Sequence, residues 1–285
     1  MEVDAGKTDS RDFDLRVKEH MAEYKRSVLK INQDGIWKRN KRPYKHILPE
    51  ESWQANILEP YRESFFNAPQ AKIQFHMDFH HLVSSQAMCI NFFYPLIAEE
   101  QLHLLLPILG MDQMAKDCIA EACFEKESNL EIAKGRRTSF DFYMQLKPNT
   151  KIFFEIKYSE NGFGKAAKDE EHLSNYSKVY MPLLKNNPAI RDRCKNEEYF
   201  LNHYQIMRNL LHIDANSTVV FIYPRDNHKI NEEALQARAE VMTPGWESKF
   251  ILYQWEGLLQ ELFKHLEDKQ LIDYYNAFAD KYLEY

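Results

Sequence analysis

Residues 138–158 read TSFDFYMQLKPNTKIFFEIKY, and this stretch decides the fold. One apolar series occupies every second position of Thr138–Leu146: Phe140, Phe142, Met144 and Leu146. A second series occupies alternate positions of Lys151–Tyr158: Ile152, Phe154 and Ile156. This period is typical of β-strands, and the intervening Lys147-Pro148-Asn149-Thr150 has the composition of a tight turn. The stretch therefore predicts an antiparallel hairpin.

Charged residues occupy the other parity of this hairpin. A turn centred on Pro148-Asn149 allows a register with Asp141 opposite Glu155, their Cβ atoms roughly 5 Å apart, and Lys157 shares the face of Glu155 because side chains alternate along a strand. Two close carboxylates repel each other, and a divalent cation such as Mg²⁺ removes that conflict. The alternative is a solvated sheet face with a cross-strand salt bridge.

Asp141, followed by Glu155-Ile156-Lys157, resembles the PD-(D/E)xK nuclease superfamily, although Phe140 stands where the motif has proline. The resemblance implies an α/β fold with a restriction-endonuclease-like αβββαβ core, in which helices flank a mixed central sheet. It implies cleavage of DNA with Mg²⁺, for which Mn²⁺ may substitute. Asp141, Glu155 and the carbonyl of Ile156 would hold the metal. Lys157 would orient or help to deprotonate the attacking water and offset the charge of the phosphate.

A closer likeness, over residues 37–265, is to a bacterial group of restriction-endonuclease-like proteins. Besides the two strand motifs it rests on three segments, which are Ser84-Ser85-Gln86-Ala87, Asn91-Phe92-Phe93-Tyr94-Pro95-Leu96 and Tyr204-Gln205-Ile206-Met207-Arg208-Asn209. The likeness implies a fold and a class of chemistry without a substrate.

Further site residues are expected on helices. Superfamily sites often add an acid from the helix before the hairpin. We predict Glu125, at the end of a helix from Asp112 to about Lys126, over the alternatives Glu121, Glu127 and Glu131.

Gln205 and Arg208 share a helical face and are predicted to support the metal or hold a phosphate, unless they form a structural surface pair. Gly162-Phe163-Gly164-Lys165 lacks the full spacing of a phosphate loop, so we expect a turn, with Lys165 as a candidate substrate contact.

The chain divides into a disordered tail (1–12), a helical and basic N-terminal extension (13–75) and the nuclease-like domain (76–285). Residues 37–46 contain five basic residues with Trp37 and Tyr44 between them, which fits either a DNA-contacting arm or a solvated flexible stretch. We also expect helices at about 14–31, 84–95, 98–106 and 255–266, a mostly helical region at 166–212, and strands at 217–223 and 250–253.

The net charge of −6 argues against tight binding to DNA through charge alone, but it allows a local basic groove. The four cysteines form no CxxC pair, and neither a signal peptide nor a membrane-length apolar run is apparent. We therefore expect a cytoplasmic protein without a membrane partner. Its predicted function is that of a Mg²⁺-dependent deoxyribonuclease of the restriction or defence kind, with DNA as partner and a homodimer considered. The alternatives are a non-catalytic nucleic-acid-binding or assembly module and a nuclease that acts on RNA.

Overall fold

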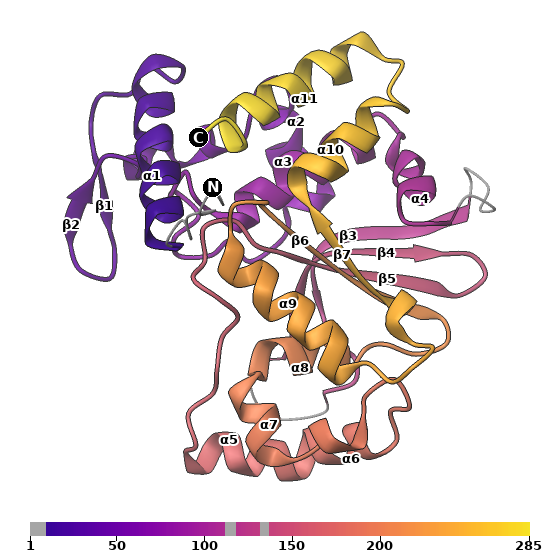
Figure 1. The fold of residues 1–285 in the computed structure, drawn as a ribbon. Helices are drawn as coiled ribbons and strands as arrows, with labels where there is room; N and C mark the ends of the chain where they lie inside the picture. The colour runs from indigo at the N-terminus through magenta and orange to yellow at the C-terminus, as the bar shows by residue number, and fades with distance from the viewer. Residues whose placement is uncertain (1–9, 112–117, 132–136) are drawn as a thin grey trace, which may run out of the picture.

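A five-stranded mixed sheet forms the centre of the molecule (Figure 1). The computed structural model describes residues 10–111, 118–131 and 137–285. The strand order is β3-β4-β5-β6-β7. β4 pairs antiparallel with both β3 and β5, whereas β6 pairs parallel with both β5 and β7. The strands are β3 (Ile119–Glu127), β4 (Ser139–Leu146), β5 (Thr150–Ile156), β6 (Ser217–Tyr223) and β7 (Phe250–Gln254). Helices before, between and after these strands complete the order predicted for an αβββαβ core, and β7 extends it, so the predicted fold class is confirmed.

The predicted hairpin is β4–β5. Phe142 pairs with Phe154 and Leu146 with Thr150, on either side of the turn. Asp141 and Glu155 are the residues next to the Phe142–Phe154 pair, at which the paired part of the hairpin ends. The alternating apolar residues and the turn composition were therefore sufficient to predict the hairpin, and these pairs agree with the register considered for it.

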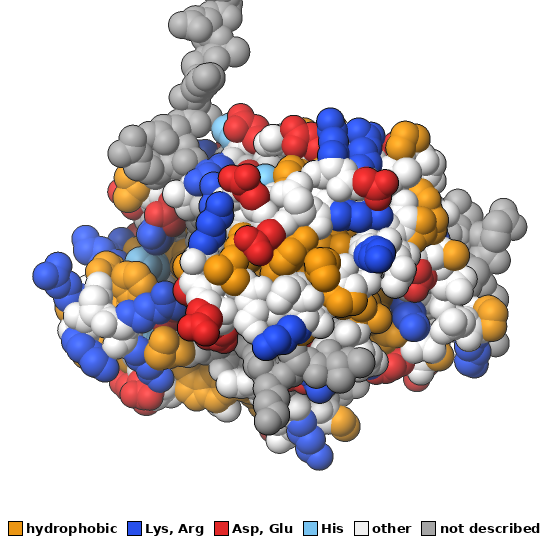
Figure 2. Space-filling view, turned by 90° about the horizontal axis from the view of Figure 1, so that it is seen from below, with side chains coloured by type: hydrophobic (Ala, Val, Ile, Leu, Met, Phe, Trp, Pro, Cys, Tyr) orange, Lys and Arg blue, Asp and Glu red, His pale blue; other side chains and the backbone are white. Residues whose placement is uncertain are grey.

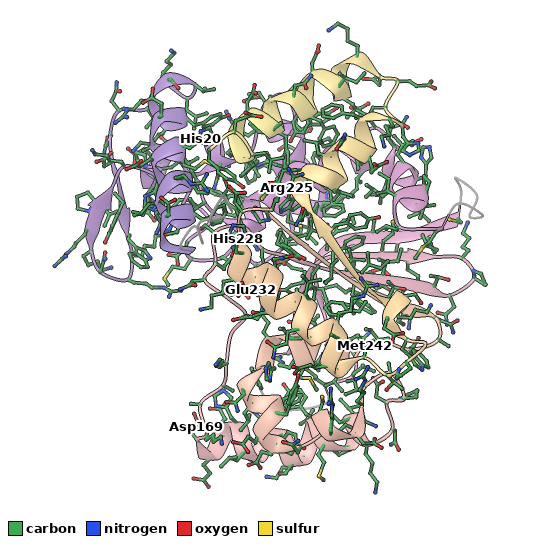
Figure 3. The ribbon with its side chains drawn as sticks, in the orientation of Figure 1. His20, Asp169, Arg225, His228, Glu232 and Met242 are labelled. Atoms are coloured by element: carbon green, nitrogen blue, oxygen red, sulfur yellow. The ribbon has the colours of Figure 1, made fainter. Side chains whose placement is uncertain are left out.

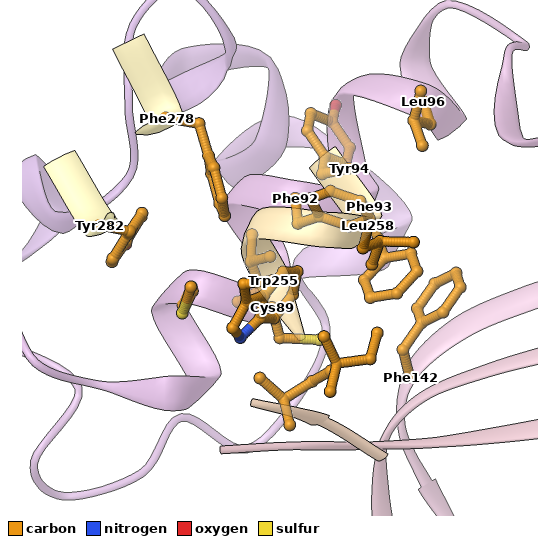
Figure 4. Close-up of a cluster of buried hydrophobic side chains, with 14 of the residues drawn as sticks. Cys89, Phe92, Phe93, Tyr94, Leu96, Phe142, Trp255, Leu258, Phe278 and Tyr282 are labelled. Atoms are coloured by element: carbon orange, nitrogen blue, oxygen red, sulfur yellow. The ribbon is translucent and has the colours of Figure 1, made fainter. Parts of the chain in front are cut away.

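Three helices cover one face of the sheet: α3 (Ser85–Ala98), α10 (Trp255–Phe263) and α11 (Lys269–Tyr282) (Figure 1). The ring of Phe93 on α3 stacks on Phe142 of β4, with 4.0 Å between ring centroids (Figure 4). Ser84 caps α3 by accepting a hydrogen bond from the amide of Ala87, which confirms the predicted start of this helix. Burial of these aromatic side chains supplies most of the stabilisation of this layer.

The opposite face packs against α8 (Tyr204–Leu210) and α9 (His228–Val241). Phe153, Val219 and Phe221 point into this second core. His228 marks the start of α9, and Met242 follows its end (Figure 3). Further short elements lead into and out of this layer: α5 (Glu170–Asn175), a π-helical turn (Tyr176–Tyr180), α6 (Met181–Lys185), α7 (Glu197–Asn202), and 3-10 helices at Asp192–Cys194 and Glu247–Lys249.

The N-terminal region packs onto the core beneath α11. Val17 and Met21 of α1 (Ser10–Ser27) are fully buried there. The basic stretch folds into a small hairpin of β1 (Gly35–Trp37) and β2 (Arg42–Tyr44). The remaining elements are a 3-10 helix (Glu50–Asn56), α2 (Tyr61–Asn67), a 3-10 helix (Pro69–Ala71), a 3-10 helix (Leu102–Leu104) and α4 (Leu105–Ile108). The predicted domain boundaries at residues 12 and 75 stay predictions.

Two helix predictions were wrong. The helix expected at 98–106 is replaced by α3, which continues through Pro95 to Ala98, and by two short helices after it. Of the helix expected at 112–126, residues 112–117 lie outside the described residues, and Ile119–Glu127 is strand β3. Ala, Glu and Lys favour helices as isolated residues, but pairing with β4 overrides that preference. Among the described helices, none is long and apolar enough to cross a membrane.

Candidate active site

Three carboxylates lie side by side across three neighbouring strands. Phe124 pairs with Phe142 and Lys126 with Phe140, so Glu125 of β3 lies across from Asp141 of β4. Glu155 of β5 follows Phe154, which pairs with Phe142. All three line an open cavity of about 510 Å³, together with Ile156 and Lys157. The structure thus brings the predicted acidic and basic residues together at one edge of the sheet.

Asp141 lies where β4 departs from regular geometry. Phe140 is buried in the second core and Phe142 in the first, although residues two apart in a regular strand share a face. The prediction of one continuous apolar series through Phe140 was therefore wrong. At this irregularity the Asp141 carboxylate accepts a hydrogen bond of 2.6 Å from the backbone amide of Ile156. Burial, followed by the charges of Glu155 and Glu125, raises the pKa of Asp141 well above its ordinary value.

Glu155 is held on both of its carboxylate oxygens. Its Oε1 accepts hydrogen bonds from Lys157 Nζ at 2.7 Å and from Gln205 Nε2 at 2.6 Å. Its Oε2 accepts one from Asn209 Nδ2 at 2.9 Å. The side chain is 4% exposed, so these three donors replace the water that an ionised carboxylate loses on burial. The position of this carboxylate is fixed from both β5 and α8.

Lys157 is a buried cation. Burial by itself would lower the pKa of its ammonium, but the charges of Glu155, Glu160 and Asp141 and the hydrogen bond to Glu155 together raise that pKa above its ordinary value. The ammonium also lies 5.4 Å from the ring centre of Phe163. Lys157 is therefore protonated at neutral pH, and it can donate hydrogen bonds and offset negative charge.

Glu125 reaches the site from a strand and not from the predicted helix end. Its backbone φ is +52°, a left-handed conformation that is uncommon outside glycine. The carboxylate accepts hydrogen bonds from Gln86 Nε2 at 2.7 Å and from Ser139 Oγ at 3.0 Å. Gln86 is itself buried on α3, so Glu125 is anchored between the first helix of the core and β4.

The three predicted substrate-binding residues all line the cavity, but in different ways. Gln205 contacts Glu155 directly. Arg208 donates a hydrogen bond of 2.9 Å to the buried carboxylate of Glu131. Lys165 is exposed at the rim. Asn209 was not predicted as a site residue, although it follows Gln205 by four positions and so lies on the same helical face.

The donor set at this edge fits a hard divalent cation. Within the described ranges, no group of three or more His, Cys, Asp or Glu side chains has the geometry of a metal site. Mg²⁺, however, is commonly bound by only one or two carboxylates and keeps water as its remaining ligands. Asp141 and Glu155 are two such carboxylates. Burial raises the pKa of Asp141 most, and the charges of Glu155 and Glu125, which a cation would offset, raise that pKa further.

Comparison with known proteins gives a match to a protein-family model. The model described as Restriction Endonuclease associating with ARP matches residues 18–283. No curated protein and no solved structure matches the chain.

Proposed function

The chain belongs to the family described as Restriction Endonuclease associating with ARP, and from this premise we propose that it is a Mg²⁺-dependent deoxyribonuclease of the restriction or defence kind. The observation that carries the proposal is the row of Glu125, Asp141 and Glu155 beside the Lys157 ammonium in one open cavity. A phosphodiester is negatively charged, so this row of acids needs a cation before it can receive one. The family match and the charge arrangement support the same chemistry.

In this proposal Asp141, Glu155 and the backbone carbonyl of Ile156 hold the metal, and Glu125 completes the acidic side of the site. Bound Mg²⁺ would polarise a phosphoryl oxygen and lower the pKa of an attacking water. Gln205 and Asn209 hold Glu155 in position through its two oxygens. Such supporting hydrogen bonds orient a ligand before the metal arrives.

Lys157 acts in this proposal as an electrostatic group. Because its pKa is raised, its ammonium keeps its proton at neutral pH and is a poor base. It donates to the phosphate and stabilises the additional negative charge that develops there during hydrolysis. Arg208 and Lys165, which line the same cavity, are proposed to contribute positive potential for the flanking phosphates.

The experiment that tests the proposed function measures cleavage of supercoiled plasmid, linear duplex, single-stranded DNA and RNA with Mg²⁺ or Mn²⁺. We expect cleavage of DNA by the wild type, which stops on chelation and in Asp141→Ala, Glu155→Ala and Lys157→Ala. Thermal unfolding with and without metal supplies a second readout, and the metal-dependent rise in Tm should disappear in Asp141→Ala.

Three outcomes would contradict the proposal in different ways. Cleavage of RNA alone would change the substrate. Cleavage that persists in Asp141→Ala, Glu155→Ala and Lys157→Ala would show that the activity does not come from this site. If the protein shows no cleavage and its Tm does not change with metal, the non-catalytic nucleic-acid-binding module is favoured.

A further inference from the structure

The active-site cavity continues into two further hollows towards the N-terminal region. A second hollow of about 850 Å³ shares His76, Glu125, Arg137 and Ser139 with the active site. A third, of about 420 Å³, shares Phe75, His76 and Met77 with the second. His76 lines all three, so the hollows adjoin one another, and the second also borders β3 through Phe124, Glu125 and Glu127. We call these three adjoining hollows the groove.

The far end of this groove is lined by aromatic side chains. Trp53, Phe75 and Phe79 line the third hollow; the ring centroid of Trp53 lies 5.3 Å from that of Phe75 and 5.6 Å from that of Phe79. Met77, at the same hollow, is 53% exposed. Trp53 and Phe75 are partly exposed, whereas Phe79 is buried behind them in the core. Accessible aromatic faces near cationic side chains are a usual means of binding an unpaired nucleobase, because every base has a flat π-face.

The walls of the groove carry basic side chains. Arg39, Lys72 and Arg137 line the second hollow, and Lys38 lines the third. Carboxylates line the same hollows, with Asp78, Glu125 and Glu127 in the second and Glu50 in the third. Lys38 and Arg39 belong to the segment of the β1–β2 hairpin, whose residues 37–46 contain no acidic residue. Figure 2 shows Lys and Arg side chains gathered on the side of the molecule where Figure 1 places this hairpin.

Three of these cations face acidic neighbours. Arg39 lies 3.4 Å from Asp78, Lys38 lies 3.2 Å from Glu50, and Arg137 lies 3.9 Å from Glu127. Each pair has at least one largely exposed member. Exposed ion pairs contribute little to stability, so these basic side chains can exchange a carboxylate for a phosphate at small cost.

We propose that this groove binds a single strand of DNA, with its phosphates along the second hollow and an unstacked base in the aromatic hollow. The inference rests on the proposed function and specifies its substrate. A base in duplex DNA is paired and stacked, so only an unpaired base can enter the hollow. The substrate is then DNA with a single-stranded segment next to the scissile phosphate.

Binding to the full chain tests this without cleavage. The Asp141→Asn protein, in a chelator, is titrated into four labelled ligands of equal length: oligodeoxythymidine, a strand with abasic sites, oligouridine and a duplex. We expect the oligodeoxythymidine to bind roughly tenfold more tightly than the abasic strand, because one stacked base is lost with each abasic site at the hollow. The duplex should also bind more weakly than the oligodeoxythymidine.

Met77→Glu places a carboxylate at the aromatic hollow on an exposed position, so the protein should still fold. This variant should lose most of the preference for oligodeoxythymidine over the abasic strand. The matched control is Met181→Glu, since Met181 is similarly exposed, at 46%, and lines none of the three hollows. The control should bind as the parent does.

Equal affinity for the oligodeoxythymidine and abasic strands, tighter binding of the duplex, or an unaltered preference in Met77→Glu would each overturn the proposal. Tighter binding of oligouridine would replace DNA with RNA as the ligand. Failure of the proposed function has a different signature. In that case the wild type cleaves none of the substrates with Mg²⁺, whatever the affinities measured here.

Discussion

Gln205 on α8 donates a hydrogen bond of 2.6 Å to Glu155 at the end of β5, fifty residues earlier in the chain. Asn209, one turn further along α8, donates to the other oxygen of the same carboxylate at 2.9 Å. The helix that covers the second core thus also determines how Glu155 faces the cavity. Because this carboxylate is buried and fixed from two sides, it needs little reorganisation to bind a cation.

Replacing Gln205 tests this coupling. We expect Gln205→Leu to weaken the response to Mg²⁺ roughly 10–100-fold, the range found for groups that orient metal ligands. The measurement is the metal concentration at half-maximal rise in Tm, together with that at half-maximal cleavage. Gln236→Leu is the matched control, because Gln236 is exposed on α9 and lines none of the three hollows. We call these half-maximal metal concentrations the metal midpoint. An unchanged metal midpoint in Gln205→Leu would show that α8 does not support metal binding at this site.

The second prediction concerns how the ion pair between Lys157 and Glu155 affects the stability of the fold. Both side chains are almost fully buried, so Lys157→Met leaves a buried carboxylate without its cation. We expect this variant to lose about 3–5 kcal/mol in the free energy of unfolding. The double variant Glu155→Gln/Lys157→Met buries no member of the pair as a charge and should recover much of that loss. Urea denaturation without metal measures both.

The double variant also separates folding from chemistry. It should be stable and inactive, because the site then lacks both the carboxylate proposed to hold the metal and the ammonium. The control compares the double variant with the single variants Lys157→Met and Glu155→Gln. If the two single losses in unfolding free energy simply add in the double variant, the two side chains act independently.

Sequence was sufficient to predict the hairpin because Phe142, Met144 and Leu146 of one strand and Ile152, Phe154 and Ile156 of the other recur at alternate positions and face one core, and a short turn joins the strands. Asp141 and Glu155 then follow from the register, and Lys157 follows from strand parity. Strand β3 was missed for a physical reason. It is an edge strand with half-buried residues, so its sequence shows no clear alternation, and its Ala, Glu and Lys residues resemble a helix.

The position of Glu125 depends on that missed pairing. Only the alignment of β3 with β4 brings Glu125 opposite Asp141, and only the packing of α3 supplies Gln86 as its donor. These are contacts between segments distant in sequence, which local patterns do not specify. Asn209, in contrast, could have been found, because its spacing from Gln205 places the two amides on one helical face.

A third prediction concerns whether Glu125 belongs to the metal site. Glu125→Gln retains the size of the side chain and removes one charge that raises the pKa of Asp141. We expect the protein without metal to gain stability and its metal midpoint to move to higher Mg²⁺ concentration. Thermal unfolding across a Mg²⁺ titration measures both effects.

The control for this prediction is Glu121→Gln on the same strand. Glu121 pairs with Lys126 and lines none of the three hollows, so its loss should leave the metal midpoint unchanged. If Glu125→Gln behaves as Glu121→Gln does, the metal ligands are restricted to Asp141, Glu155 and the Ile156 carbonyl.

The last prediction is a pH dependence of stability that arises beside the site, at His212. Burial, the largest effect, lowers the pKa of this imidazole from 6.5 to about 4. Its Nδ1 faces the carbonyl of Arg208 at 3.0 Å and its Nε2 lies 2.7 Å from Ser128 Oγ. Since a carbonyl only accepts, the neutral ring carries its proton on Nδ1 and accepts from the serine at Nε2.

The unfolded chain therefore binds a proton at His212 more readily than the folded one. The neutral imidazole contributes its full stability above pH 6.5, and that contribution is lost as the pH falls to about 4, an effect of up to about 3 kcal/mol. His46 and His81 also have pKa values lowered to about 4, so the acid sensitivity of the whole protein does not isolate the effect of His212.

The informative quantity is the difference in unfolding free energy between the wild type and His212→Asn, measured by urea denaturation at each pH. We expect this difference to be largest near neutral pH and to shrink towards pH 4, whereas His265→Asn, at an exposed position, should follow the wild type throughout. A constant difference across the range would mean that His212 stabilises the fold through packing against Phe140 and Phe153 and not through its protonation state.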